Sequence, residues 1–231
     1  MRGVSKPLKI GVLGGIGPEA TGEFYNKLIF SLQKQKLIRS NKDYPQIIIN
    51  SVPSPELIEN SDNLDSYIRG LRELSKLKPD FIVMVCNTIH LYYNLLQSKI
   101  SIPIIDLRLE VKKHLVKKNI KSALIIGTSE TIKRGLYNFN SLKCVTPNYK
   151  EVKDLSGAIY NFNKGSNKKY QICLTKKICK KYLKRGVKTI ILGCTEFAVM
   201  LKNEKFSKIN TLDILVEAIV NKFKEYYGHG R

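Results

Sequence analysis

The sequence predicts an α/β fold made of two similar halves, each a three-layer α/β/α unit with a mostly parallel sheet. Short runs of β-branched and aliphatic residues alternate with longer amphipathic segments, which is the pattern of parallel strands joined by crossover helices. Two of these runs, "FIVMVCNTIH" and "TIILGCTEFA", end alike in a cysteine and polar residues. A chain of 231 residues is long enough to bury the core of two such halves.

The expected strands, in chain order, are residues 9–14, 46–52, 81–86, 102–107, 122–128 and 189–194. Among the helices the last is the clearest, because one of its faces repeats at three-four spacing. That face holds Leu212, Leu215, Val216, Ile219, Val220 and Phe223. Asn210 or Thr211 is available to cap its start, and the helix is expected to end before Gly228.

The second half repeats the pattern of the first. Both "KIGVLGGIGPEATGEFYNKL" and "SALIIGTSETIKRGLYNFN" lead from a strand through a turn of small residues into a helix, and Cys86 and Cys194 lie 108 residues apart. We therefore expect an internal duplication with pseudo-twofold symmetry and a functional site between the halves. Residues 1–104 and 206–231 are expected to form one domain, and residues 105–205 the other.

The formal charge of +21 is the most unusual property of the composition. Lysines occur along the whole chain, and the densest run, "KKYQICLTKKICKKYLKR", keeps an apolar face of Leu174, Ile178 and Tyr182. A solvated surface explains the charge better than a nucleic-acid site, and attraction of anionic substrates also fits it. No apolar run is long enough for a membrane span or typical of a signal peptide. We expect a cytoplasmic protein with neither a nucleic-acid nor a membrane partner.

The five cysteines are an odd number and include no close pair such as C-x-x-C. Free thiols in a reducing compartment are expected, and no metal site is predicted. Cys86 and Cys194 differ from the rest because each is expected to end a strand, where parallel sheets bind ligands. The following helix offers N–H groups and a positive dipole end, which favour a thiolate. Buried cysteine is a common core residue, but two in matching places favour a site in which two thiols face one small anion.

Three segments, "GVLGGIGPEAT", "VCNTIH" and "LGCTEF", resemble the aspartate/glutamate racemase family in their order and spacing, and its aspartate racemase branch in particular. The resemblance implies a homodimer that inverts the α-carbon of an amino acid without pyridoxal phosphate (PLP) or any other cofactor. It implies that one cysteine, as thiolate, removes the α-proton and the other, as thiol, returns a proton on the opposite face. Cys86 and Cys194 match these positions, and such an inversion does require an acid and a base on opposite faces.

The resemblance also indicates which residues hold the substrate. The expected substrate-binding residues are Gly15, Ser51, Asn87, Thr88, Thr128, Lys164 and Thr195. Helix capping explains the asparagine and the three threonines equally well, and a solvated side chain explains the lysine nearly as well. Glu196 and His90 are candidates for tuning the thiols, although each could equally be structural. The N–H groups of the turns after the strands are candidates for stabilising the carbanion.

One region departs from the family pattern. Many aspartate racemases carry a Pro-Asp-Arg stretch after the second strand, whose arginine grips a carboxylate, whereas this chain has "NSVPSPELIEN" with Leu57 at that place. Leucine does not replace the planar guanidinium fork. The segment looks more like members with broader acidic specificity, in which Ser51 approaches the ligand. Aspartate is the expected substrate, and glutamate or another acid is the alternative.

Other activities stay open. Maleate isomerases, hydantoin racemases and arylmalonate decarboxylases are related branches, but a decarboxylase needs only one cysteine, so the pair favours racemisation. A nicotinamide-dependent oxidoreductase is suggested by Gly15, Gly17 and Ala20, which loosely fit the dinucleotide fingerprint. Pro18 and Glu19 count against it, because they are helix-start residues where a pyrophosphate would lie. A basic binding module that keeps a racemase-like fold is the alternative that is not an enzyme.

Overall fold

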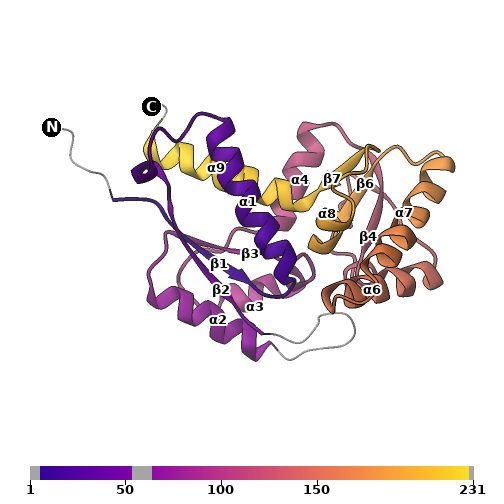
Figure 1. Ribbon diagram of the computed structural model, residues 1–231, viewed down its shortest axis with the longest axis horizontal. Helices are drawn as coiled ribbons and strands as arrows, with labels where there is room; N and C mark the ends of the chain where they lie inside the picture. Colours follow the sequence, from indigo (N-terminus) through magenta and orange to yellow (C-terminus); the bar gives the residue numbers. More distant parts are fainter. Residues whose placement is uncertain (1–5, 54–63, 229–231) are drawn as a thin grey trace.

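The protein is described by a computed structural model over residues 6–53 and 64–228 (Figure 1). Its strands form two parallel sheets, with the order β2-β1-β3 in the first and β5-β4-β6-β7 in the second. The first sheet contains β1 (Lys9–Gly14), β2 (Gln46–Ser51) and β3 (Phe81–Met84). The second contains β4 (Ser122–Gly127), β5 (Lys143–Val145), β6 (Ile190–Gly193) and β7 (Lys208–Asn210). The prediction of an α/β fold with parallel sheets is confirmed.

Helices follow the strands on both faces of the sheets. Between β1 and β4 the chain forms α1 (Pro18–Lys34), the 3-10 helix η1 (Asn41–Asp43), α2 (Asp65–Lys76), the 3-10 helix η2 (Thr88–Tyr92), α3 (Tyr93–Gln97) and α4 (Leu107–Lys117). After β4 it forms α5 (Ser129–Lys133), α6 (Tyr149–Asn163), α7 (Lys168–Lys184), α8 (Thr195–Met200) and α9 (Thr211–Tyr227).

The two sheets share one strand order, which agrees with the expected duplication. Residues 102–107 do not form a full strand; a parallel bridge from Ile104 to Ile82 takes the fourth position of the first sheet, where β7 stands in the second. Pro103 lacks an N–H group, although its carbonyl accepts a 2.9 Å bond from the Ile82 N–H. The strands β5 and β7 were not predicted, because three residues are too few to show a period.

Alternating side chains of the strands enter different cores. On β3, Phe81 and Val83 enter a large core that also contains Ile125 of β4 and the buried face of α9. Ile82 and Met84 of β3 face the opposite way, into a second core with α2. The large core therefore covers one face of both sheets and joins the two halves, while α2 in the first half and α6 with α7 in the second cover the other faces.

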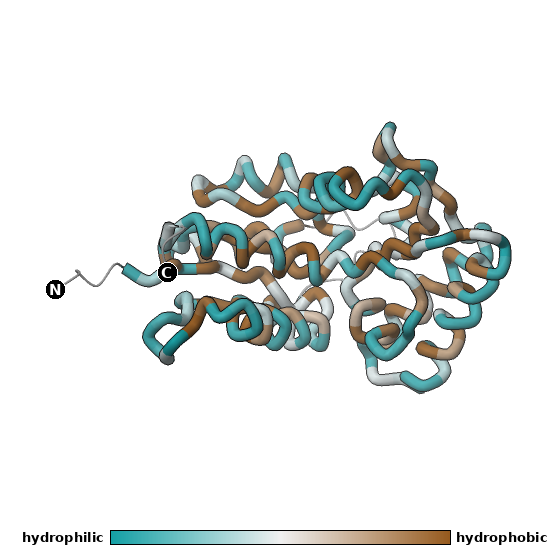
Figure 2. Tube along the Cα trace, turned by 90° about the horizontal axis from the view of Figure 1, so that it is seen from above, coloured by the Kyte–Doolittle hydropathy of each residue, from teal (hydrophilic) through white to brown (hydrophobic). Residues whose placement is uncertain are grey.

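The last helix connects the halves. Asn210 caps it by accepting a 3.0 Å hydrogen bond from the Leu212 N–H, and the helix ends before Gly228, as expected. All six residues of its predicted apolar face are buried, and Figure 2 shows hydrophilic and hydrophobic residues alternating along the helices. Although β7 pairs with β6 in the second sheet, α9 packs against α1 and α4. The domain boundaries at residues 104 and 205 stay a prediction.

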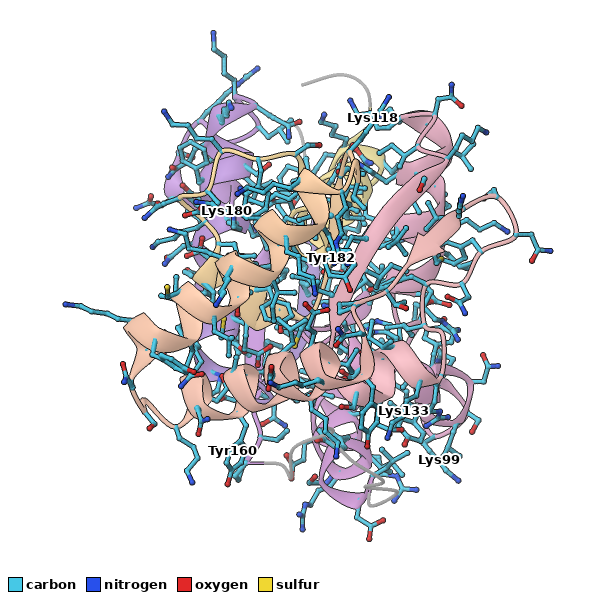
Figure 3. All side chains as sticks on the ribbon, turned by 90° about the vertical axis from the view of Figure 1, so that its right-hand side faces the viewer. Lys99, Lys118, Lys133, Tyr160, Lys180 and Tyr182 are labelled. Atoms are coloured by element: carbon cyan, nitrogen blue, oxygen red, sulfur yellow. The ribbon has the colours of Figure 1, made fainter. Side chains whose placement is uncertain are left out.

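The lysines are dispersed over the surface. Lys99, Lys118, Lys133 and Lys180 come from different segments of the chain and lie at separate places in Figure 3. Several cations are paired, as in the bonds from Lys176 to Glu204 and from Lys181 to Glu151. Within residues 6–53 and 64–228, every helix is too short or too polar for a membrane span.

Removing the Phe223 side chain tests the shared core. Phe223 is 2% exposed, so Phe223→Ala is expected to lower the free energy of unfolding by about 3–5 kcal/mol, through lost burial and the cavity left behind. Chemical denaturation measures the change. The matched control is Phe30→Ala on α1, because Phe30 is 63% exposed and its loss should cost less than about 0.5 kcal/mol. Equal effects of the two substitutions would contradict the assignment of α9 to the core.

Candidate active site

Cys86 and Cys194 lie at matching turns after the third strand of each half. The expectation that each ends a strand needs a small correction, because β3 ends at Met84 and β6 at Gly193. The Val85 N–H still donates to the Leu13 carbonyl at 3.0 Å, and the chain then leaves the ladder. Cys194 is the N-cap residue of α8. The two cysteines are 7% and 3% exposed, so both thiols are largely shielded from water.

Cys86 and Cys194 lie near enough for the charge of one to affect the other. Burial is the main cause that raises the pKa of Cys194 well above its ordinary value, and the charges of Glu196 and Cys86 raise it further. Burial together with the Glu196 carboxylate raises the pKa of Cys86 to about 12. Since Glu196 affects both cysteines, the three groups lie near one another where the two halves meet.

The expected preference of Cys86 for the thiolate form is outweighed by its burial, which raises its pKa. The N–H groups of Ile89 and Thr88 and the Thr88 hydroxyl do lower the pKa of Cys86, as helix-start donors should. Burial acts in the opposite direction and is larger, because a charged sulfur loses its hydration. The prediction from the dipole was therefore right about the donors and wrong about the net direction.

Glu196 is the centre of a hydrogen-bonded group. The Cys194 thiol donates to its Oε2 at 2.8 Å and the Thr195 hydroxyl at 3.3 Å, while the Asn163 amide donates to Oε1 at 2.9 Å. A Cβ at Gly17 would collide with the same Oε1, so this carboxylate lies against the start of α1. Sequence reasoning missed Asn163, which has no motif of its own and reaches Glu196 only through the fold.

Three threonine hydroxyls form a buried triangle across the two halves. Thr88 is 3.0 Å from both Thr128 and Thr131, and the Thr128 hydroxyl donates to Thr131 at 3.1 Å. Thr128 also caps α5 by accepting the Thr131 N–H, so its capping role is confirmed and the hydroxyl still faces the site. Thr131 was not predicted, although its place in "GTSET" on the turn after β4 is a usable signal.

The other predicted residues make contacts of their own. Gly15 has φ +86° and its N–H donates to Thr21 at 3.1 Å, so a glycine is required there and that donor is already used. Ser51 is exposed at the end of β2. The Lys164 ammonium donates to the Tyr160 hydroxyl at 3.2 Å and lies over that ring, at the outer edge of the molecule (Figure 3). Leu57 lies outside the described residues.

His90 and Asn87 support the turn that carries Cys86. The His90 Nδ1 is 2.8 Å from the Cys86 carbonyl oxygen, and burial lowers the pKa of His90, so the ring is neutral near pH 7. Asn87 makes no capping bond at the start of η2; its side-chain oxygen accepts a hydrogen bond from the Tyr137 hydroxyl instead. Tyr137 comes from the second half and was not predicted.

The fold and the site together define a two-lobed α/β protein with paired thiols at the carboxyl ends of parallel strands, a pair suited to act as acid and base. The sequence model of the Asp/Glu/Hydantoin racemase family matches residues 13–219, and the chain belongs to that family. This confirms the resemblance inferred from the cysteine motifs.

Solved structures share the fold. An aspartate racemase homologue from Pyrococcus horikoshii has a TM-score of 0.70 at 24% identity and covers 94% of this chain and 99% of its own. The aspartate racemase of Picrophilus torridus has a TM-score of 0.73 at 21% identity, with 95% and 98% covered. Glutamate racemase from Francisella tularensis, in complex with D-glutamate, has a TM-score of 0.65 at 16% identity, with 97% and 83% covered.

Among curated proteins, the chain is similar to the broad specificity amino-acid racemase RacX of Bacillus subtilis. The two are 34% identical over 132 residues, which is 55% of this chain. The match spans 58% of the length of that racemase.

Replacing Glu196 with glutamine tests the electrostatics of the site. Because the Glu196 carboxylate raises the pKa of both Cys86 and Cys194, Glu196→Gln is expected to lower both pKa values. Titration of the cysteine ¹³Cβ resonances by NMR measures each thiol separately. The control is Glu204→Gln: burial, with Glu204 adding to it, raises the pKa of Cys179 to about 12, so this change should move Cys179 alone. Unchanged pKa values at both site cysteines would rule out the proposed coupling.

Proposed function

We propose that this protein is a PLP-independent amino-acid racemase that inverts the α-carbon by proton transfer between Cys86 and Cys194. The observation that carries the proposal is the position of two buried cysteines at matching turns after β3 and β6, with the Cys194 thiol bonded to the Glu196 carboxylate. Racemisation by deprotonation requires a base on one face of the α-carbon and an acid on the other, with roles that exchange after each turnover. Membership of the racemase family supports the same reaction.

The two thiols differ in their hydrogen bonds, and this difference assigns their first roles. Cys86 receives stabilising contacts from two N–H groups and the Thr88 hydroxyl, which suit a thiolate. Cys194 donates its proton to Glu196, which suits a thiol. In the proposed step Cys86 takes the α-proton and Cys194 gives its proton to the opposite face. The products are Cys86 thiol, Cys194 thiolate and the inverted amino acid, so the next turnover runs in the opposite sense.

Burial has a chemical purpose in this proposal. The α-proton of an amino acid is weakly acidic, so its base must be strong, and a thiol with a raised pKa gives a strongly basic thiolate. The carbanion needs donors that are fixed before the reaction and shielded from water. Hydroxyls of Thr88, Thr128 and Thr131 and the amide of Asn87 are buried donors beside the turns.

The proposed substrate is a small acidic amino acid, aspartate first and glutamate second, and Lys164 is the candidate cation for its side-chain carboxylate. A homodimer in the cytoplasm stays a prediction. A second candidate is a racemase of broad specificity. Three observations favour broad specificity. Leu57 stands at the arginine position, Lys164 contacts Tyr160, and the chain is similar to a broad specificity racemase.

The alternatives of other classes are less well supported. A dinucleotide pyrophosphate would need the space at the start of α1, where the Glu196 carboxylate lies against Gly17 and Glu19 pairs with Lys168. The negative pyrophosphate and the Glu196 carboxylate would then repel each other. A basic binding module is favoured only by the cations along one side of α7, which include Lys177, Lys180 and Lys184. The family match and the matching cysteine turns after β3 and β6 favour the racemase instead.

Deuterium exchange tests the proposed reaction. Incubation with L-aspartate, L-glutamate and a panel of neutral and basic L-amino acids in deuterated buffer, without added cofactor, is expected to give α-deuterium incorporation together with inversion. Proton NMR follows the exchange and chiral chromatography the inversion. Exchange confined to the two acids supports the acidic substrate, whereas exchange across the panel supports broad specificity. No exchange with any amino acid would refute the racemase.

Cysteine variants test the roles of the thiols in the same assay. Cys86→Ala and Cys194→Ala are each expected to abolish racemisation with the fold intact, because each removes one sulfur. Cys179→Ala is the matched control, since Cys179 is also a buried cysteine but lies within α7 and not on a turn after a strand. Full activity in either site variant would refute the two-thiol mechanism.

The pH dependence follows from the pKa of the base. A pKa of about 12 for Cys86 leaves only a small thiolate fraction in the free enzyme near neutral pH. That fraction grows as pH rises toward the pKa, so kcat/KM is expected to increase continuously from about pH 7 to about pH 10. Initial exchange rates at low substrate concentration measure it, and Glu196→Gln should shift the rise to lower pH. A plateau beginning below about pH 8 would contradict a raised pKa.

A further inference from the structure

Asn87 has one satisfied and one unsatisfied side-chain group. It is 0% exposed, and its Oδ1 accepts a hydrogen bond from the Tyr137 hydroxyl. Its Nδ2 has no hydrogen-bond partner among the described residues. A buried donor without a partner costs free energy. A ligand can supply the missing acceptor of such a group, so the free amide calls for an explanation.

The location of this amide connects it with the two thiols. Asn87 directly follows Cys86. The Tyr137 hydroxyl, which donates to Asn87, is affected by the charges of both cysteines. Burial raises the pKa of Tyr137 well above its ordinary value, and the charges of Cys86 and Cys194 raise it further. The Tyr137 hydroxyl is therefore protonated near pH 7 and close to both sulfurs.

Tyr137 itself is firmly held. It is 1% exposed, packs in the large shared core and makes an edge contact with Phe139 at 6.1 Å between ring centroids. The two ends of an asparagine amide have similar shapes, so packing alone distinguishes its two orientations poorly. A fixed hydroxyl that donates to the oxygen does distinguish them, because it places Oδ1 toward Tyr137 and Nδ2 away from it.

We infer that Tyr137 is a positioning residue, which holds the Asn87 amide so that Nδ2 faces the substrate and donates a hydrogen bond to its α-carboxylate. This inference rests on the proposed racemase function. When the α-proton leaves, negative charge moves onto the carboxylate oxygens, and a donor fixed in advance stabilises that charge more than the ground state. Tyr137 acts through Asn87 and has no proton-transfer role.

The pairing also connects the two halves. Asn87 belongs to the turn after β3 of the first half, and Tyr137 follows α5 of the second. The donor toward the substrate is therefore oriented only when both halves are in place, beside the same turn that carries Cys86.

Kinetics of substituted enzymes test the inference with whichever amino acid the wild type exchanges. Tyr137→Phe removes only a hydroxyl and is expected to lower kcat by about 10- to 100-fold with a smaller change in KM, because the lost interaction strengthens in the transition state. Asn87→Ala should lower kcat at least as much. In the double variant, Tyr137→Phe should add nothing further, because it acts through the absent amide. An equal additional loss in the double variant would refute the inference.

The matched control is Tyr182→Phe. The Tyr182 hydroxyl is also bonded, donating to Glu151 at 2.8 Å and accepting from the Asn148 N–H at 3.1 Å, but it belongs to α7 and neither partner is a site residue described above. Its loss is expected to lower stability and leave kcat unchanged. If Tyr182→Phe lowers kcat as much as Tyr137→Phe does, loss of stability explains both and the inference fails.

A measurement without turnover separates this inference from the proposed function. In a ¹H–¹⁵N spectrum, the side-chain amide of Asn87 is identified as the signal that Asn87→Ala removes. Tyr137→Phe is expected to shift this signal and to narrow the separation of its two protons, because the amide becomes free to rotate, whereas Tyr182→Phe leaves it unchanged. No amino acid exchanging in the wild type would refute the racemase, while the spectrum would still report on Tyr137. An unchanged Asn87 signal in Tyr137→Phe would refute the positioning role itself.

Discussion

The buried carboxylate of Glu196 is the constraint on which the site depends. A carboxylate at 4% exposure is tolerated only if its oxygens are bonded, and these bonds come from several elements. Cys194 and Thr195 bond to it at the start of α8, and Asn163 bonds from the end of α6. Gly17 leaves space for it at the start of α1. These bonds fix the Cys194 thiol within the second half, and the close approach to Gly17 places the carboxylate against the first half.

The same burial sets the chemistry. Both thiols have raised pKa values mainly because they are shielded from water. The charge of Glu196 raises both values further, and the charge of Cys86 raises that of Cys194. A second thiolate beside the first is disfavoured, so the site is suited to holding one proton between two sulfurs. That is the state that a reaction with one acid and one base requires.

The halves function as one body because their cores are continuous. The large core covers one face of both sheets, and α9 starts from the second sheet and packs on α1 of the first. The hydroxyl triangle of Thr88, Thr128 and Thr131 and the bond between Tyr137 and Asn87 also cross the junction. The shared apolar core thus holds the turns in fixed relative positions, and the polar contacts form between them.

The sequence by itself determined the α/β class, five of the seven strands described by the structure, and the last helix with its cap. It also determined the matching places of Cys86 and Cys194 just after strands. Hydrophobic periodicity and repeated strand-end motifs are local signals, which is why the sequence alone carries them. Tertiary structure alone decided what surrounds the thiols. Asn163, Thr131 and Tyr137 reach the site from distant parts of the chain, and no local pattern encodes such contacts. The net pKa of Cys86 was decided in the same way, because desolvation depends on the whole surrounding fold and here exceeds the effect of the nearby N–H groups.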